Sequence, residues 1–174
     1  MPDAPTITFE TDEFGVGVLT LNRPDRLNAF TEAMADLWCQ TLVEAGRSTD
    51  VKVIVVTGAG RAFCAGGDIE EMLGFEETEA MAFKEFLWEH VQEIPLALER
   101  IDKPVIAALN GTARGAGLDM ALMCDLRIAA ESAIFAESYI NVGIIAGDGG
   151  TYFLPRLVGP ARALELFWTG RDVD

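Results

Sequence analysis

The sequence has 174 residues, of which half are hydrophobic and 24% are charged, a composition typical of one globular domain with a sizeable core. The net charge of −15 argues against a nucleic-acid partner, because phosphate backbones bind to basic surfaces. Three cysteines and one histidine show no metal-binding spacing, so reduced thiols and no metal site are expected. The first residues lack the features of a secretory signal, and no apolar run reaches about 18 residues. A soluble, cytoplasmic protein without a membrane partner is therefore predicted.

Strand and helix patterns alternate along the chain. Apolar alternation and β-branched runs predict strands, and helical spacing with capping residues predicts helices. The expected strands are 16–21, 51–57, 104–109, 126–130 and 134–137. The expected helices begin after the caps Thr31 and Asp68, span 78–94 up to a break or kink at Pro95, and span 118–123 and 161–167. This order predicts an α/β fold with mostly parallel strands.

Two glycine-bearing loops each follow a strand and precede a helix, and a third glycine-rich turn covers 144–150. The first loop reads FCAGGD (63–68) and the second NGTARGAG (110–117). Neither matches a phosphate-binding loop, and Asp68, Glu70 and Glu71 would repel a phosphate. Two backbone N–H groups from such loops suit an oxygen that becomes negative during a reaction. Purely structural turns are the alternative interpretation.

Four segments resemble, in order, the enoyl-CoA hydratase/isomerase family, the crotonase superfamily. They are 15–30, VKVIVVTGAGRAFCAGGDIEEM (51–72), DKPVIAALNGTARGAGLDMALMCDLRIA (102–129) and 147–170. The resemblance implies an α/β crotonase-like (ClpP/crotonase) ββα-superhelix core. It would occupy residues 1–174 as a single domain, with the family's usual C-terminal helical part absent. A homotrimer or hexamer is implied for the full-length protein.

The resemblance also implies an acyl-CoA thioester as substrate, with coenzyme A part of that substrate and no separate cofactor. Family members stabilise the thioester enolate with two backbone N–H groups. On this chain the donors of that oxyanion hole would be Gly67 and Ala116. Hydration or double-bond isomerisation of an enoyl-CoA is the expected reaction. A non-catalytic acyl-CoA-binding or assembly subunit that kept the fold is the alternative.

The carboxylates expected for this chemistry depart from the family pattern. Asp119 matches the first family carboxylate, although an acid in a first helical turn also has a purely structural explanation. Tyr139 stands at the second carboxylate position, where a phenol can donate a hydrogen bond or a proton. A half-buried strand aromatic is an equally good interpretation. Glu137, placed about 7 Å away on the same face of an extended strand, and Asp148 are candidates to replace the missing group. Either acid could equally be surface charge. The loss of one carboxylate favours isomerisation over hydration, because a single base can move a proton between two carbons.

Contacts to coenzyme A are less well marked. The resemblance places Arg26, Leu27, Ala65, Asp68 and Ile69 in substrate or CoA binding. An exposed arginine in a turn is the simpler interpretation for Arg26. Glu70 stands where hydratases often carry lysine, which removes a phosphate partner. His90 is interpreted as a surface histidine.

Overall fold

A computed structural model describes residues 4–74 and 80–174, and its main feature is a five-stranded sheet. The sheet contains β1 (Ile7–Thr11), β2 (Val16–Leu21), β3 (Val53–Gly58), β5 (Val105–Leu109) and β7 (Leu126–Ala129), in that order. The β1–β2 pair is antiparallel and the remaining neighbours are parallel. A second, parallel sheet joins β4 (Ala62–Cys64), β6 (Thr112–Arg114) and β8 (Phe135–Ala136). The predicted α/β class with mostly parallel pairing is confirmed.

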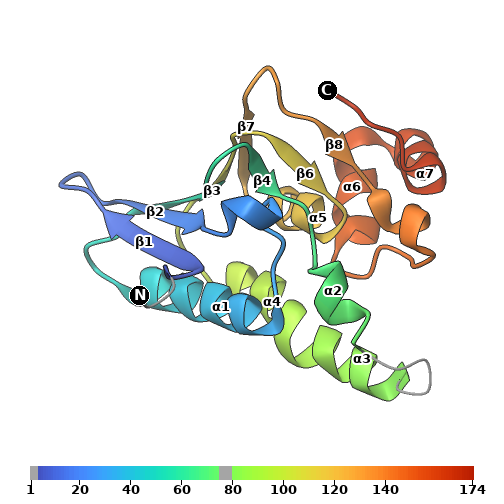
Figure 1. Cartoon of the computed structure of the whole chain (residues 1–174). Coiled ribbons are helices and arrows are strands. Elements are labelled where there is room, and N and C mark those ends of the chain that lie inside the picture. The colour runs from blue at the N-terminus through green and yellow to red at the C-terminus, as the bar shows by residue number, and fades with distance from the viewer. Residues whose placement is uncertain (1–3, 75–79) are drawn as a thin grey trace.

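Helices α1 (Glu32–Arg47) and α4 (Glu93–Glu99) pack together and cover one face of the large sheet (Figure 1). Helix α5 (Ala116–Leu122) contacts β4, β6 and α6 (Gly150–Val158), and α6 packs on α7 (Pro160–Thr169). The shorter helices are η1 (Pro24–Arg26), α2 (Ile69–Met72), α3 (Ala80–Phe86), the π-helical η2 (Leu87–Val91) and the 3₁₀-helix η3 (Ser138–Val142). Within the described residues, none of these helices is long and apolar enough to cross a membrane.

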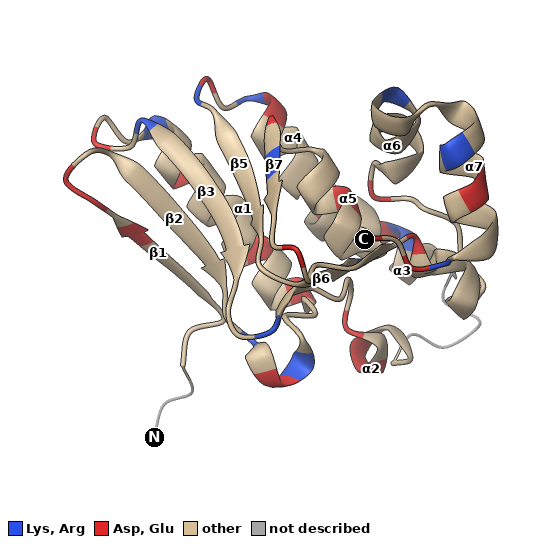
Figure 2. Cartoon of the chain, turned by 90° about the horizontal axis from the view of Figure 1, so that it is seen from above, with Lys and Arg blue, Asp and Glu red and all other residues tan. Residues whose placement is uncertain are grey.

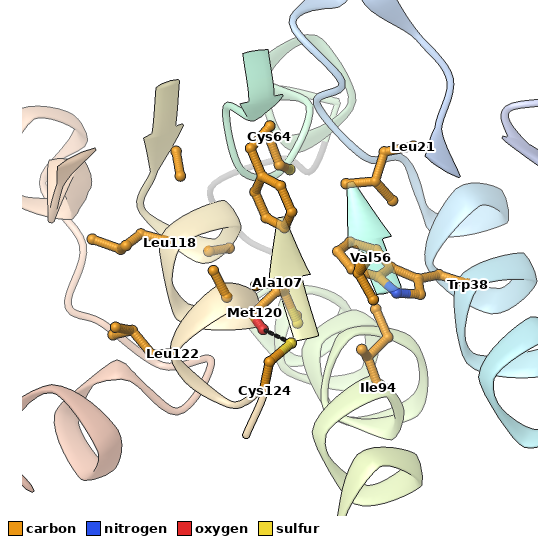
Figure 3. Packing of buried hydrophobic residues seen from close by; sticks show 14 of the residues in the cluster. Leu21, Trp38, Val56, Cys64, Ile94, Ala107, Leu118, Met120, Leu122 and Cys124 are labelled. Atoms are coloured by element: carbon orange, nitrogen blue, oxygen red, sulfur yellow. Dashed lines mark hydrogen bonds between the residues drawn. The ribbon is translucent and has the colours of Figure 1, made fainter. Parts of the chain in front are cut away.

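The core lies between the large sheet and its helices. Figure 3 shows Trp38 of α1 and Ile94 of α4 meeting Val56 of β3, and all three side chains are at most 2% exposed. Charged residues lie mainly in the loops and on the helices, and the body of the large sheet contains few of them (Figure 2). Burial of this apolar surface is the main favourable contribution to folding.

Both predicted helix caps are confirmed. The Thr31 hydroxyl accepts a hydrogen bond from the Met34 N–H at 3.3 Å, which satisfies one of the unpaired donors of the first turn of α1. The Asp68 carboxylate accepts from the Glu70 N–H at 3.1 Å and caps α2 in the same way. The first cap starts the helix that covers the sheet, and the second starts α2 directly after the first glycine loop.

Of the two outcomes predicted at Pro95, an end of the helix or a kink, the end is wrong, because Pro95 lies within α4. Residues 78 and 79 lie outside the described part, and from Ala80 the chain runs through α3, η2 and α4 to Glu99. A proline ring clashes with the carbonyl four residues earlier, here Val91, the last residue of η2. The wider π-helical turn before the proline replaces the regular ladder at that point, so the helical path continues.

The expected strand 134–137 is shorter than predicted. Strand β8 holds only two residues, and Tyr139 lies in the 3₁₀-helix η3 rather than on an extended strand. The extended geometry predicted for Glu137 and Tyr139 is therefore wrong. Helix α6 was not predicted, because Pro155 lies inside it and a glycine-rich turn precedes it.

Candidate active site

A cavity of about 840 Å³ opens between the two glycine loops, η2 and the segment that joins η3 to α6. Its walls are mainly apolar, with side chains that include Phe30, Ile69, Leu73, Phe86, Leu87 and Ile145. Among the residues that the structure describes, no Lys or Arg lines the cavity. The space therefore suits an uncharged, apolar chain.

The two glycine loops are in direct contact beside this cavity. Gly66 has φ = +100°, a conformation that strongly favours glycine. A Cβ on Gly66 would lie 3.1 Å from the Arg114 carbonyl oxygen and 3.6 Å from the Ala116 nitrogen. The loops thus approach each other closely through their backbones.

Two backbone amides on the cavity wall have no acceptor in the part of the chain that the structure describes. Phe30 and Gly67 form a parallel β-bridge. In this bridge the Phe30 N–H donates to the Gly66 carbonyl, and the Asp68 N–H donates to the Phe30 carbonyl. The Gly67 N–H takes part in neither hydrogen bond. Ala116 is the first residue of α5, and first-turn amides have no acceptor within their helix. Across residues 4–74 and 80–174, neither amide donates to a protein acceptor, and both residues line the cavity.

The first loop is held in place by Asn28, a fully buried residue with φ = +57°. Its amide nitrogen donates to the carbonyls of Ala59, Ala62 and Phe63 at 2.9, 2.8 and 3.2 Å. The preceding carbonyl, that of Leu27, accepts from the Ala65 N–H at 3.0 Å. These bonds tie the turn after β2 to the strand that leads into the Gly66–Gly67 loop.

Asp119, Tyr139 and Asp148 meet in one hydrogen-bonded group. The Tyr139 hydroxyl lies 2.7 Å from Asp119 Oδ2 and 2.9 Å from Asp148 Oδ2. Tyr139 and Asp148 line the cavity, whereas Asp119 has no exposed surface and lies behind them. The residue that the resemblance favoured as the catalytic acid therefore reaches the cavity only through Tyr139.

Burial changes the acidity of every member of this group. Burial, together with the Asp148 charge, raises the pKa of Asp119 to about 7, although the Tyr139 hydrogen bond lowers it. Burial likewise raises the pKa of Asp148 and, with the two aspartates, that of the Tyr139 phenol. Strongly shifted acids beside a cavity are characteristic of catalytic sites.

Glu137 joins the same group from the buried side. Only 1% of it is exposed, and neither carboxylate oxygen has a donor among the described residues. Burial and the neighbouring Asp119 raise the pKa of Glu137 to about 9. Glu137 is therefore not the surface acid of the simpler interpretation, and neither is Asp148, which is 6% exposed.

The residues predicted to contact CoA are more scattered. Ala65 and Ile69 line the cavity. Asp68 is buried, caps α2 and pairs with Arg23 at 2.9 Å. Arg26 and Glu70 form an exposed two-bond ion pair at 2.7 and 2.9 Å, so the arginine predicted to meet a CoA phosphate already has a carboxylate partner. Leu27 precedes Asn28 in the turn with φ = +52°. The roles of these residues in CoA binding remain predictions.

His90 lies away from the cavity lining, on η2, and contacts α1. Its Nδ1 is 2.7 Å from Asp36, and its Nε2 is 3.6 Å from Glu32. The Asp36 hydrogen bond raises the pKa of this imidazole. His90 therefore links η2 to α1, and the two nearby carboxylates explain its position without a catalytic role.

Several parts of the cavity wall, including Ser138 and the stretch from Val142 to Ile145, were not predicted from the sequence. Ser138 lines the cavity, and its buried hydroxyl has no partner among the described residues. The mainly apolar stretch from Val142, the last residue of η3, to Ile145 also lines the cavity, and Ile145 is 86% exposed. A run of apolar residues just before a glycine turn was the only available signal.

Comparison with known proteins identifies the family of the chain. The family profile described as enoyl-CoA hydratase/isomerase matches residues 11–174. The mitochondrial enoyl-CoA hydratase of Pongo abelii is 43% identical over 161 residues, covering 91% of this chain and 53% of that protein. The 1,2-epoxyphenylacetyl-CoA isomerase of Escherichia coli K12 is 39% identical over 166 residues, covering 93% of this chain and 62% of that protein.

The solved structures agree with the sequence comparisons. The enoyl-CoA hydratase of Mycobacterium smegmatis superposes with a TM-score of 0.88 at 35% identity, covering 98% of this chain and 65% of the other. The predicted crotonase-like fold is thereby confirmed. The chain spans less than two thirds of the length of the curated relatives that it matches, 64% in the case of a Bacillus subtilis relative.

Proposed function

Because the chain belongs to the enoyl-CoA hydratase/isomerase family, we propose that it binds an enoyl-CoA thioester and moves the double bond through an enolate. The observation that carries this proposal is the pair of unpaired amides, Gly67 and Ala116, on the wall of one cavity with Tyr139 and Asp148. The thioester carbonyl would accept from both N–H groups. As the enolate forms, charge grows on that oxygen, and both hydrogen bonds strengthen. Removing one such donor typically costs about 10²–10³ in rate.

The proton transfer is assigned to Asp148, with Tyr139 beside it. As a carboxylate, Asp148 would take a proton from C2 of a β,γ-unsaturated thioester and return the same proton to C4. One C–H bond breaks and one forms, the double bond moves into conjugation, and no water is consumed. The apolar walls and the lack of a lining Lys or Arg in the described residues favour an uncharged acyl chain.

Isomerisation is preferred to hydration because of the groups that face the cavity. Hydration needs one group to activate water and a second to protonate the α-carbon. The cavity offers Asp148 and a phenol that is already hydrogen-bonded to it at 2.9 Å. A phenol with a raised pKa is a poor base at neutral pH. One carboxylate that removes and returns a single proton fits these groups better.

Two optical assays separate the candidate reactions. A β,γ-enoyl-CoA would gain the absorbance of a conjugated thioester if the protein isomerises it. An α,β-enoyl-CoA would lose that absorbance if the protein hydrates it. Rapid gain with little loss is the expected result. Binding without any spectral change would instead support the non-catalytic acyl-CoA-binding alternative and overturn the proposed reaction.

The amide contribution can be tested at Ala116. Proline is tolerated at the first position of a helix, so Ala116→Pro deletes the N–H while its ring suits α5. Ala116→Gly keeps the N–H and serves as the matched control. We expect the proline variant to lose about 10²–10³ in kcat and the glycine variant to stay within about threefold of the parent. Equal rates in a folded proline variant would remove Ala116 from the oxyanion hole.

A further inference from the structure

The hydroxyl of Tyr139 has one proton but two carboxylate neighbours. Asp119 Oδ2 and Asp148 Oδ2 both lie within hydrogen-bond distance of it, at 2.7 and 2.9 Å. A phenol can donate to only one of them and must accept from the other. Both contacts are satisfied when one of the two aspartates is itself protonated. The geometry therefore requires a carboxyl proton at this point.

A second carboxyl proton would provide a donor for Glu137 and Asp119. Both Glu137 oxygens and Asp119 Oδ1 are buried and have no donor among the described residues. Glu137 lies near enough to Asp119 for their charges to interact, because burial and the Asp119 charge together raise the pKa of Glu137. Two ionised carboxylates only accept, so they would repel each other. A proton on Glu137 turns this contact into a hydrogen bond that Glu137 donates.

We propose that Glu137, Asp119, Tyr139 and Asp148 form one proton relay that carries a single negative charge, with Glu137 as a neutral donor to Asp119. This inference rests on the proposed function only for its catalytic consequence. The hydrogen-bond count itself is independent of any substrate. Of the four groups, only Tyr139 and Asp148 line the cavity.

The relay has two arrangements that satisfy every link. In the first, Asp148 is protonated and donates to Tyr139, Tyr139 donates to Asp119, and Asp119 bears the charge. In the second, Asp119 is protonated and donates to Tyr139, Tyr139 donates to Asp148, and Asp148 bears the charge. Two protons shift by one bond each, one between Asp148 and Tyr139 and one between Tyr139 and Asp119. Glu137 donates to Asp119 in both arrangements.

This exchange gives each residue a role. The second arrangement presents a carboxylate to the cavity, where it can accept the proton of C2. The first withdraws the charge to Asp119, which has no exposed surface. Asp119 and Glu137 are then positioning residues that act through Tyr139. The raised pKa of Glu137, about 9, keeps it protonated at neutral pH and agrees with the donor role.

Infrared spectroscopy can count the protonated carboxyls directly. At pH 7 the exposed acids are ionised, so the C=O absorbance of protonated carboxyls reports buried ones. We expect two such groups in the parent protein and one in Glu137→Gln, because the Gln amide donates without a carboxyl proton. Glu131→Gln, which changes an exposed acid, is the matched control and should leave the signal unchanged. No protonated-carboxyl absorbance in the parent, or an unchanged signal in Glu137→Gln, would overturn the relay.

Activity provides a separate readout. Glu137→Gln retains the donor and should keep kcat within about threefold, whereas Glu137→Met removes the donor and should lower kcat. Tyr139→Phe breaks the relay and should lower kcat by about 10²–10⁴. If the Met variant does not fold, the kcat values of Glu137→Gln and Tyr139→Phe are compared instead. An equal loss of kcat in both variants would contradict the role of Glu137 as a donor. If infrared spectroscopy finds the expected protonated carboxyls but the protein does not turn over an enoyl-CoA, the proposed function is refuted and the hydrogen-bond arrangement of the relay is retained.

Discussion

Tyr139 stands where the family resemblance called for a carboxylate, and its neighbours explain how a phenol fits there. A carboxylate at this position would add a further negative charge to a buried group that already contains Asp119 and Asp148. The phenol is neutral and can donate to one aspartate while it accepts from the other. The tyrosine at this position therefore goes with the acid at Asp148, which contacts the phenol at 2.9 Å. The residues nominated from sequence do meet, but which of them faces the cavity depends on η3.

The buried acid Glu137 predicts a pH dependence of stability. Its pKa rises from an ordinary 4.5 to about 9 on folding, so the native state binds more protons than the unfolded state between these values. The free energy of unfolding therefore falls as pH rises through this window, and the contribution of Glu137 is complete only below about pH 4.5. Glu137→Gln cannot ionise, so this loss should disappear.

We expect the stability of Glu137→Gln relative to the parent to increase by at least about 1 kcal/mol between pH 5 and pH 9, since one pKa unit corresponds to about 1.4 kcal/mol. Urea unfolding at the two pH values measures the difference. Glu131→Gln should show no such trend, because Glu131 is exposed. A constant difference between parent and Glu137→Gln across the window would show that Glu137 does not hold its proton.

At the scale of secondary-structure elements, those whose hydrophobic pattern extends over many residues were predicted correctly, and the shortest elements were not. The β-branched run of β3 and the capped, amphipathic α1 carry their signals over six or more residues. Strands β4 and β6 hold three residues each, too few for alternation to emerge. Strand β8 was predicted within 134–137 but holds only two residues. Helix α6 was hidden by Pro155, which usually argues against a helix interior.

The proton relay was beyond prediction for a related reason. Three of its members, Glu137, Tyr139 and Asp148, are spread over 12 residues of sequence. The local sequence pattern predicted an extended strand for the stretch from Glu137 to Tyr139. The actual path is a two-residue strand, a 3₁₀-helix and a turn to α6. Tertiary packing against α5 and α7 decides this path, since a five-residue 3₁₀-helix has little stability of its own. The family resemblance indicated which residues to consider, and only the three-dimensional fold shows which of them are in contact.

Helix α5 is pressed against β4 at Gly117, which predicts the effect of adding one methyl group. A Cβ there would overlap the Cys64 carbonyl oxygen and lie 2.8 Å from the Cys64 carbonyl carbon. Alanine is the better helix former by about 1 kcal/mol, but the clash with backbone outweighs that gain. We expect Gly117→Ala to lower the unfolding free energy by about 1–3 kcal/mol and to reduce turnover, because the neighbouring Ala116 amide moves.

Denaturant unfolding and the isomerisation assay measure these two effects. Gly46→Ala is the matched control, because this helical glycine faces the Ile101 side chain at 3.0 Å rather than a backbone carbonyl. A side chain can shift more easily, so its cost should be smaller and its turnover unchanged. A Gly117→Ala protein as stable and active as the Gly46→Ala protein would show that α5 is free to move away from β4.

Charge is the property of the whole molecule that bears on an acyl-CoA ligand. The chain has a net charge of −15, and coenzyme A itself carries negative phosphates. Arg26, the cation predicted to meet a phosphate, is already paired with Glu70. Long-range repulsion should therefore oppose binding at low salt. The acyl part is different, because the cavity that would hold it is mainly apolar.

This opposition predicts an unusual salt dependence. Screening becomes effective as the Debye length falls from about 30 Å at 0.01 M to about 10 Å at 0.1 M. Acyl-CoA binding should thus tighten several-fold over that range, whereas the corresponding N-acetylcysteamine thioester, which lacks phosphates, should hardly change. Glu70→Gln releases Arg26 and should tighten acyl-CoA binding by about two- to fivefold at low salt, the contribution of one exposed ion pair. Calorimetric titration measures the affinity of the parent for each of the two ligands and the affinity of Glu70→Gln for acyl-CoA. Weaker acyl-CoA binding at higher salt would mean that cations near the cavity mouth, rather than the net charge, control the approach of the ligand.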